Sequence, residues 1–282
     1  MRLGLVLSGG GIRGIAHAGV LKALEEYDIK VDIIGGTSSG SLVASLYAMG
    51  YSPYYIYTLF DMYSKDIVNI NSAPIINGIG NFMMSKKVKL SGLKTGDNIE
   101  KIFDEMANRK GIKKISDIKM PIAIPSVDVA DSKEYIFSNY RPQNTNNYIT
   151  NISVGKAVRA SSSFPVVFSP CEFEKHKFLD GGTLNNTPVN PVKELGADKI
   201  IAVNFSADKI DEKSDIMDIV MKTLDIMGNK ISEEGLKKAD YVLTVPSDKT
   251  GLLDIEKIKK CYNFGYQAVK DNIEEILTML KE

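Results

Sequence analysis

Histidine and cysteine are scarce in this chain, which has two of each among its 282 residues. The cysteines, Cys171 and Cys261, are far apart and define no disulfide framework. Together with the two histidines, His17 and His176, they cannot supply a recognisable zinc site. We therefore expect a reduced, intracellular protein that holds no metal and requires no cofactor.

The chain also lacks an excess of one charge and a long apolar run. Its 35 basic residues balance its 35 acidic ones, so there is no broad basic field and we expect no nucleic-acid partner. No run approaches the length of a transmembrane helix, and the N-terminus has Arg2 but not the apolar core of a signal peptide. These absences favour a cytoplasmic protein that contacts membranes only peripherally.

What is present is an alternation of apolar strands and helices, in a chain that is 44% hydrophobic and 25% charged. The alternation predicts an α/β fold, a three-layer α/β/α sandwich with a central, mostly parallel sheet. No linker rich in proline and serine interrupts it, so we expect one domain over 1–282. Its motif-bearing core spans about 2–205, and a C-terminal strand and helices in 206–282 pack on that core. The expected strands are Leu3–Leu7, Val31–Gly35, Pro121–Val129, Glu134–Phe137, Glu172–Asp180, Lys199–Phe205 and Tyr241–Val245, and the expected helices are Ser41–Met49, Asn98–Ala107, Ser153–Ser162, Ile216–Ile231 and Val269–Leu280.

Ser38 lies in Gly36-Thr37-Ser38-Ser39-Gly40, where an apolar strand is expected to turn into a helix. A serine with glycines at i−2 and i+2 can occupy a sharp, strained turn, because larger flanking residues would clash there. The turn exposes the hydroxyl at the N-terminus of the following helix, where the dipole and free N–H groups favour negative charge. The pentapeptide therefore predicts a nucleophilic serine, although the pattern alone also arises by chance.

A second glycine cluster, Gly9-Gly10-Gly11-Ile12-Arg13-Gly14, follows the first expected strand. Its spacing also satisfies the dinucleotide-binding pattern, but Asp32 stands at the start of the second strand and not at its carboxyl end, where that pattern needs an acid. No Gly-Lys-Ser/Thr follows, which excludes a P-loop. We expect the first two strands to end side by side, which brings the N–H groups of Gly9, Gly10 and Gly11 near Ser38 to hold an oxyanion.

A serine nucleophile needs a base, and the histidines are poorly placed for that role. The Ser…Asp…His order of α/β-hydrolases would require an acid before His176, and we interpret both histidines as structural residues. Asp180 ends a strand-like stretch, and Gly181-Gly182 let the chain turn away, which presents a carboxylate at a strand end. Asp-Gly is also a common turn dipeptide, so the residues alone leave both interpretations open. Asp128 and Asp131 are weaker rivals, because no glycine turn follows them.

In this order, Gly9–Gly14, Gly36–Gly40 and Asp180-Gly181-Gly182 resemble the motifs of the patatin-like phospholipase family, and Ala157–Pro165 and Asn185–Pro188 are similar to it as well. The resemblance runs from about Arg2 to Phe205. It implies a bacterial-type, single-domain member with the patatin-like fold, which works with a Ser–Asp dyad and no catalytic histidine. The implied roles are nucleophile for Ser38, general base for Asp180, oxyanion hole for Gly9, Gly10 and Gly11, and support for Arg13, Gly14, Gly36, Gly40, Gly181 and Gly182.

The implied reaction is hydrolysis of a carboxylic ester in a phospholipid or lysophospholipid through an acyl-enzyme. An aspartate with an ordinary pKa of about 3.9 is a weak base for this task, so we expect a partly desolvated site that raises the pKa of Asp180. Ser38 and Asp180 would serve equally in a carboxylesterase or thioesterase that acts on soluble acyl esters. A catalytically idle lipid-binding module is a third alternative.

Region 51–94 is the least regular part of the pattern and is dense in aromatic residues and methionine. It directly follows the expected nucleophile helix, so we predict a lid or acyl-chain pocket that contacts membranes or micelles, with Lys86, Lys87 and Lys89 near phosphate. A peripheral core patch or a dimer contact explains the same residues. Arg13 and Arg159 each have two interpretations, a lipid phosphate contact and a local structural one, and the structural one is favoured for Arg159.

Overall fold

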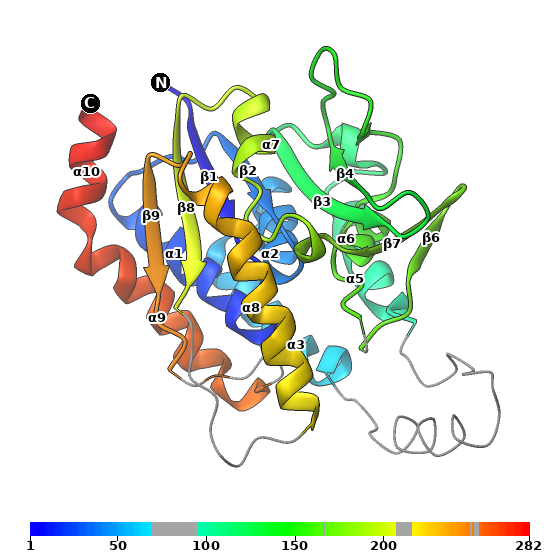
Figure 1. The fold of residues 1–282 in the computed structure, drawn as a ribbon. Helices are drawn as coiled ribbons and strands as arrows, with labels where there is room; N and C mark the ends of the chain where they lie inside the picture. The colour runs from blue at the N-terminus through cyan, green and yellow to red at the C-terminus, as the bar shows by residue number, and fades with distance from the viewer. Residues whose placement is uncertain (69–94, 166, 207–215, 249, 251–253) are drawn as a thin grey trace.

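One β-sheet organises the computed structural model, which describes the chain except residues 69–94, 166, 207–215, 249 and 251–253 (Figure 1). The strands are β1 (Leu3–Leu7), β2 (Ile33–Gly36), β3 (Ile122–Asp128), β4 (Lys133–Ser138), β5 (Tyr148–Ile149), β6 (Cys171–Phe173), β7 (His176–Asp180), β8 (Lys199–Phe205) and β9 (Tyr241–Val245). Within the described residues the sheet runs in the order β5-β4-β3-β2-β1-β8-β9. Strand β7 pairs with β3, and β6 pairs with β7.

The middle of the sheet is parallel, as predicted. Strand β1 lies between β2 and β8, with Leu5 opposite both Ile34 and Ile201. Strand β3 is parallel to β2 but antiparallel to β4 and β7. Strand β1 is a continuous apolar run because both faces of the sheet are covered. The carboxyl ends of β1 and β2 therefore lie side by side, and the two glycine motifs leave the sheet from neighbouring positions.

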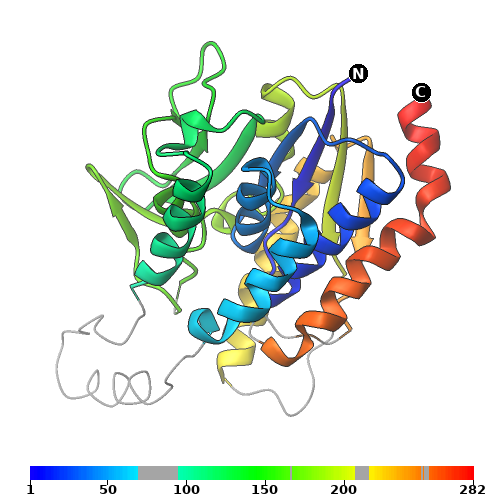
Figure 2. The same cartoon turned by 180° about the vertical axis from the view of Figure 1, so that it is seen from behind.

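Helices cover both faces of the sheet, which makes the three layers of the predicted sandwich. They are α1 (Ala16–Glu26), α2 (Ser39–Ala48), α3 (Pro53–Val68), α5 (Asp97–Arg109), α6 (Val154–Ser161), α7 (Val189–Glu194), α8 (Ile216–Leu236), α9 (Ile258–Asp271) and α10 (Ile273–Lys281). Helices α1, α2, α3 and α9 lie on the face seen in Figure 2, and α7 and α8 lie on the opposite face. No helix in the described part of the chain combines the length and the apolar character needed to cross a membrane.

The C-terminal helices pack directly on the N-terminal half of the chain. A Cβ atom added at Gly265 of α9 would lie 1.8 Å from the carbonyl oxygen of Ala16, and one at Gly19 of α1 would lie 2.0 Å from that of Tyr262. These distances leave no room for a side chain, so the two glycines allow α1 and α9 to cross backbone against backbone. The Tyr266 hydroxyl donates a 2.6 Å hydrogen bond to Glu26 at the edge of this contact.

We expect Gly265→Ala to lower the free energy of unfolding by about 1–3 kcal/mol, because the new methyl group forces the two backbones apart. Urea denaturation measures the change. Gly228→Ala is the matched control, since Gly228 is also helical but its nearest neighbouring atom, in Asn186, would be 3.7 Å from the added Cβ. That control should be neutral or slightly stabilising, because alanine favours helix more than glycine does. Equal stability of the two variants would contradict the close-packing account.

Three expectations about elements were wrong. The stretch from Glu172 to Asp180 is a β-hairpin and not one strand, because the chain turns at Glu174, whose φ is 51°. The predicted helix Val269–Leu280 is interrupted at Asn272, where α9 ends and α10 begins. The described beginning of region 51–94 is regular, since α3 runs from Pro53 to Val68. The rest of that region, 69–94, lies outside the described residues, and with it the lysines predicted near phosphate.

Candidate active site

Ser38 occupies a sharp turn between β2 and α2, as its flanking glycines predicted. Its backbone has φ 52° and ψ −123°, a conformation that residues with a side chain rarely adopt. A Cβ atom at Gly36 would lie 2.3 Å from the carbonyl oxygen of Gly40, and one at Gly40 would lie 2.3 Å from that of Leu7. Both glycines are therefore required by close backbone approach. Ser38 immediately precedes the first turn of α2, where free N–H groups favour negative charge.

The glycine loop lies against this turn, and a Cβ atom at Gly9 would be 3.2 Å from the Cβ of Ser38. Two of the three predicted oxyanion donors are already engaged. The N–H of Gly9 donates to the carbonyl oxygen of Asn186 at 3.1 Å, and that of Gly10 donates to the hydroxyl of Ser39 at 3.1 Å. Gly11 begins a 3₁₀-helix (Gly11–Ile15), and within the described residues its N–H has no hydrogen-bond partner. Of the three predicted donors, only that of Gly11 is thus without a hydrogen-bond partner within the described residues.

Asp180 ends β7 and is buried, with 2% of its surface exposed. Its Oδ1 accepts the N–H of Gly182 at 2.8 Å, while its Oδ2 is buried and has no hydrogen-bond partner among the described residues. Burial raises the pKa of Asp180 to about 7, against the opposing effects of the Ser38 side chain and the Gly182 N–H. The Asp180 carboxyl group thus interacts with the Ser38 side chain and keeps one oxygen without a hydrogen bond among the described residues, and its desolvation agrees with the expectation from the sequence.

The segment after Asp180 joins the two glycine motifs to each other. The Thr37 hydroxyl donates to the carbonyl oxygen of Asn185 at 2.8 Å, next to the carbonyl of Asn186 that accepts the Gly9 N–H. The Asn185 side chain in turn donates to Glu134 at 2.6 Å. A Cβ atom at Gly181 would lie 2.3 Å from the carbonyl oxygen of Pro125, so this turn also needs its glycine. These contacts hold the serine turn, the glycine loop and the aspartate turn in one unit.

Both histidines make contacts that involve neither Ser38 nor Asp180. His17 is fully buried in α1 and donates from Nε2 to the carbonyl oxygen of Ser8 at 2.8 Å. Burial lowers its pKa to about 4, so it is neutral near pH 7. His176 forms a 2.6 Å contact through Nδ1 with Asp128, one of the rival bases. The other rival, Asp131, accepts the Tyr135 hydroxyl at 3.0 Å in an exposed position.

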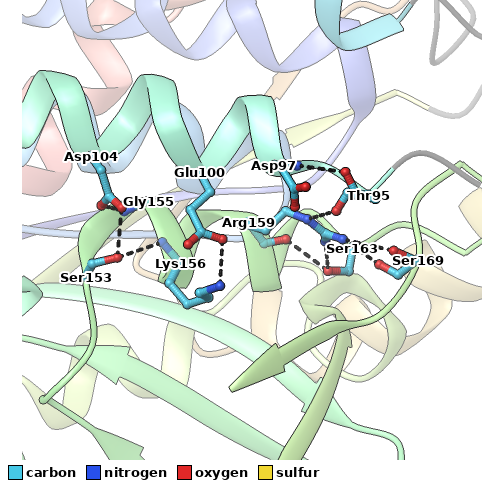
Figure 3. A network of polar contacts seen from close by, with 10 residues as sticks. All are labelled: Thr95, Asp97, Glu100, Asp104, Ser153, Gly155, Lys156, Arg159, Ser163 and Ser169. Carbon is cyan, nitrogen blue, oxygen red and sulfur yellow. Dashed lines mark hydrogen bonds and ion pairs between the residues drawn. The ribbon is translucent and has the colours of Figure 1, made fainter. Parts of the chain in front are cut away.

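The two arginines singled out from the sequence are buried, with 4% of Arg13 and 2% of Arg159 exposed. Arg13 donates from Nε to the carbonyl oxygen of Gly10 at 3.2 Å, and its guanidinium lies 5.4 Å from the ring centre of Phe205. Arg13 therefore stabilises the glycine loop through its hydrogen bond to the Gly10 carbonyl oxygen. Arg159 is enclosed by hydroxyl and carbonyl oxygens, which matches the structural interpretation favoured for it (Figure 3).

Sequence reasoning missed Ser161, whose hydroxyl accepts the backbone N–H of Ser38 at 3.1 Å. Ser161 is the last residue of α6 and is fully buried. The one signal in the sequence is the run of three serines that follows Arg159 and an alanine, in a stretch already similar to the family motifs.

A family model described as patatin-like phospholipase matches residues 5–193, well over half of the chain. The match spans the glycine loop, the serine turn and the aspartate turn in the order found here. The chain belongs to the patatin-like phospholipase family.

The curated relatives are much longer proteins. Lysophospholipase NTE1 of Candida albicans is 28% identical over an alignment covering 95% of this chain and 20% of the relative. Lysophospholipase nte1 of Aspergillus fumigatus is 34% identical over 73% of this chain and 12% of the relative. The chain thus spans about a fifth or less of the length of these relatives.

The solved structures that match this chain do so at low sequence identity. The heterodimeric ExoU–SpcU complex from the type III secretion system of Pseudomonas aeruginosa gives a TM-score of 0.49 at 18% identity, over 97% of this chain and 52% of that chain. Human GIVD cytosolic phospholipase A2 in complex with a fluorophosphonate gives a TM-score of 0.48 at 12% identity, over 99% of this chain and 59% of that chain.

Proposed function

We propose that this chain is a serine acyl hydrolase that cleaves carboxylic ester bonds of phospholipids or lysophospholipids. The observation that carries the proposal is the interaction of Ser38, on a strained turn at a helix N-terminus, with Asp180, a buried carboxyl group with one oxygen unpartnered among the described residues. Membership of the family and the names of the lysophospholipase relatives support a lipid ester as the substrate.

In the proposed reaction, Asp180 Oδ2 accepts the Ser38 proton as Oγ attacks the ester carbonyl carbon. The tetrahedral oxyanion is stabilised by the Gly11 N–H and by the N-terminus of α2, which carries positive partial charge. The alcohol or lysolipid leaves with the proton from Asp180. Water, deprotonated by the same carboxylate, then attacks the acyl carbon of the acyl-enzyme. The bond to Ser38 Oγ breaks as Oγ takes the proton back from Asp180, which releases the fatty acid and regenerates free Ser38.

A raised pKa suits Asp180 for this task, because a base works best when its pKa lies near the working pH. The glycine motifs support the chemistry indirectly. Gly36, Gly40 and Gly181 each permit a backbone approach that a side chain would block, and Gly14 leaves room for the side chain of Ser39. Arg13 supports the loop through the Gly10 carbonyl. Gly182 donates its N–H to Asp180 and so fixes the orientation of the carboxyl group.

The proposal extends to the setting of the enzyme. We propose one domain over residues 1–282, because β9 continues the sheet and α9 packs on α1. We also propose a cytoplasmic enzyme that contacts membranes or micelles peripherally. The exposed apolar side chains of α3, Tyr54 and Met62, support such a contact.

Hydrolysis of two substrate sets tests the proposed function. One set is a chain-length series of p-nitrophenyl esters, and the other is lysophospholipid micelles and diacylphospholipid vesicles. We expect turnover of the lipid set by the intact protein and its loss in Ser38→Ala. Turnover of short soluble esters alone would assign the chain to carboxylesterases. No turnover of either set would favour the idle lipid-binding module.

A further inference from the structure

The end of α6 contacts both proposed catalytic residues through their backbones. The Ser161 hydroxyl accepts the N–H of Ser38 at 3.1 Å, and the carbonyl oxygen of Ser163 accepts the N–H of Asp180 at 3.1 Å. Ser161 and Ser163 are both fully buried. Two segments that are distant in sequence are thus connected through Ser161 and Ser163, which we call the serine bracket.

We infer that Ser161 is a positioning residue, whose hydroxyl holds the Ser38 turn so that Oγ stays directed at the Asp180 carboxylate. The inference rests on the proposed Ser38–Asp180 dyad. A positive φ at a residue with a side chain persists only where the surroundings over-determine it. The Ser38 N–H lies at this strained point, and Ser161 is its hydrogen-bond partner. Without that hydroxyl the N–H loses its partner, and the turn can relax away from the base.

Arg159 holds the serine bracket at Ser163, as Figure 3 shows. Arg159 donates from Nε to the carbonyl oxygen of Thr95 at 2.5 Å and from Nη2 to that of Ser169 at 2.6 Å. Its Nη1 donates to the Ser163 hydroxyl, which donates back to the Arg159 carbonyl oxygen at 2.9 Å. These acceptors are neutral oxygens, and no ion pair to Arg159 forms within the described residues. The guanidinium therefore acts as a rigid multiple donor that fixes three segments.

The start of α6 is fixed as firmly as its end (Figure 3). Asp104 of α5 accepts the Gly155 N–H at 2.7 Å, and the Lys156 ammonium lies 2.8 Å from the Glu100 carboxylate. A Cβ atom at Gly155 would lie 2.1 Å from the carbonyl oxygen of Glu100, so the helices touch at this point. The serine bracket thus lies at the end of α6, a helix that is anchored along its length. Such a rigid support is needed to keep a strained turn in position.

The chain supplies its own control. Ser162 lies between the two bracket contacts and is 6% exposed, yet its hydroxyl has no hydrogen-bond partner among the described residues. Ser161→Ala and Ser162→Ala remove the same atom from adjacent buried positions. Only the first removes a contact to Ser38. A difference between the two variants therefore reports the contact and not the loss of a buried serine.

The experiment measures kcat and KM on a short-chain p-nitrophenyl ester and the rate of covalent labelling by a fluorophosphonate. We expect Ser161→Ala to lower kcat and the labelling rate about tenfold to a hundredfold, with KM within about twofold. The Ser38 N–H would lose its hydrogen-bond partner, which displaces the reacting Ser38 hydroxyl and leaves the rest of the substrate site in place. Ser162→Ala should stay within about twofold of the intact protein in all three quantities, because it removes no bond. Equal values for the two variants would overturn the inference.

A second pair keeps the test decisive if Ser161→Ala fails to fold. Ser161→Thr keeps the hydroxyl acceptor, and Ser161→Val has the same shape without it. The threonine variant should exceed the valine variant in kcat by about tenfold, because only it can accept the Ser38 N–H. Equal kcat values would contradict the role of the hydroxyl. Ser38→Ala is measured alongside: if it retains full activity, the proposed function itself fails, whatever the bracket variants do.

Discussion

Asp180→Asn should reduce ester hydrolysis by about a thousandfold or more, because an amide cannot accept the Ser38 proton. The substitution is nearly isosteric, and the amide oxygen can still accept the Gly182 N–H that Asp180 Oδ1 accepts at 2.8 Å. The geometry of the turn should therefore survive while its chemistry is lost. The measurement is fatty acid release from a lysophospholipid, or release of p-nitrophenol from a soluble ester, normalised to folded protein.

The same variant should be more stable than the intact protein above pH 7, which separates loss of the base from loss of the fold. Burial raises the Asp180 pKa from 3.8 to about 7 in the folded protein. The proton is thus bound more tightly in the folded state. The stability associated with it is fully present below about pH 3.8 and is lost progressively as the pH rises from there to about 7. Asparagine stays neutral and avoids this loss. Urea denaturation at pH 5 and pH 8 should show a larger stability advantage of Asp180→Asn at pH 8 than at pH 5.

An Asp180→Asn variant that keeps more than about a tenth of the activity would remove Asp180 as the base, since proton transfer usually contributes at least a hundredfold. If the Asp180→Asn variant is inactive and also unfolded, the Ser38→Ala variant and the pH profile test the dyad in its place. Asp128 would then be the next carboxylate to replace, although its contact with His176 points away from that role.

The second large effect is an acidic limb in the pH profile of kcat/KM. The base must be ionised to accept the proton, and the Asp180 pKa is raised to about 7. We expect kcat/KM to fall about tenfold per pH unit below that value, and so to be about a hundredfold below its plateau at pH 5. Above about pH 8 the profile should be flat until other groups titrate.

A histidine would give a limb in a similar range, so the profile needs a control. His176→Gln removes the one partly exposed histidine and touches neither Ser38 nor Asp180, and the limb should keep its position. His17 is an unsuitable source, because burial lowers its pKa to about 4. A limb near pH 4 would indicate an ordinary, solvated aspartate. A limb that disappears in His176→Gln would transfer the role of base to that histidine.

Three strands of mainly apolar residues could be predicted to the residue. The predicted strands Leu3–Leu7, Lys199–Phe205 and Tyr241–Val245 are β1, β8 and β9. Strand β1 is buried throughout and β8 nearly so, whereas β9 lies at the edge of the sheet and alternates between buried and more exposed residues. The apolar composition of each strand marks both of its ends. The β6–β7 hairpin could not be predicted, because Glu174 adopts a positive φ without the glycine or asparagine that usually signals one.

The candidate site divides in the same way. The motifs that hold Ser38, Asp180 and the glycines have a local geometry set by neighbouring residues. Such geometry can be predicted from the sequence. The Gly9 and Gly10 N–H groups donate hydrogen bonds to Asn186 and Ser39. These contacts join residues far apart in the sequence, so no local pattern predicts them. The contact of Ser161 with Ser38 is of the same kind, because it depends on where α6 ends against the sheet.

The measurement that tests the central claim most directly is covalent labelling with a fluorophosphonate, followed by peptide mass spectrometry. Our account predicts one label per chain, on the peptide that contains Ser38, with labelling abolished in Ser38→Ala and strongly slowed in Asp180→Asn. Label on another serine, or ester hydrolysis that continues after Ser38 is fully modified, would contradict the dyad and with it the proposed function.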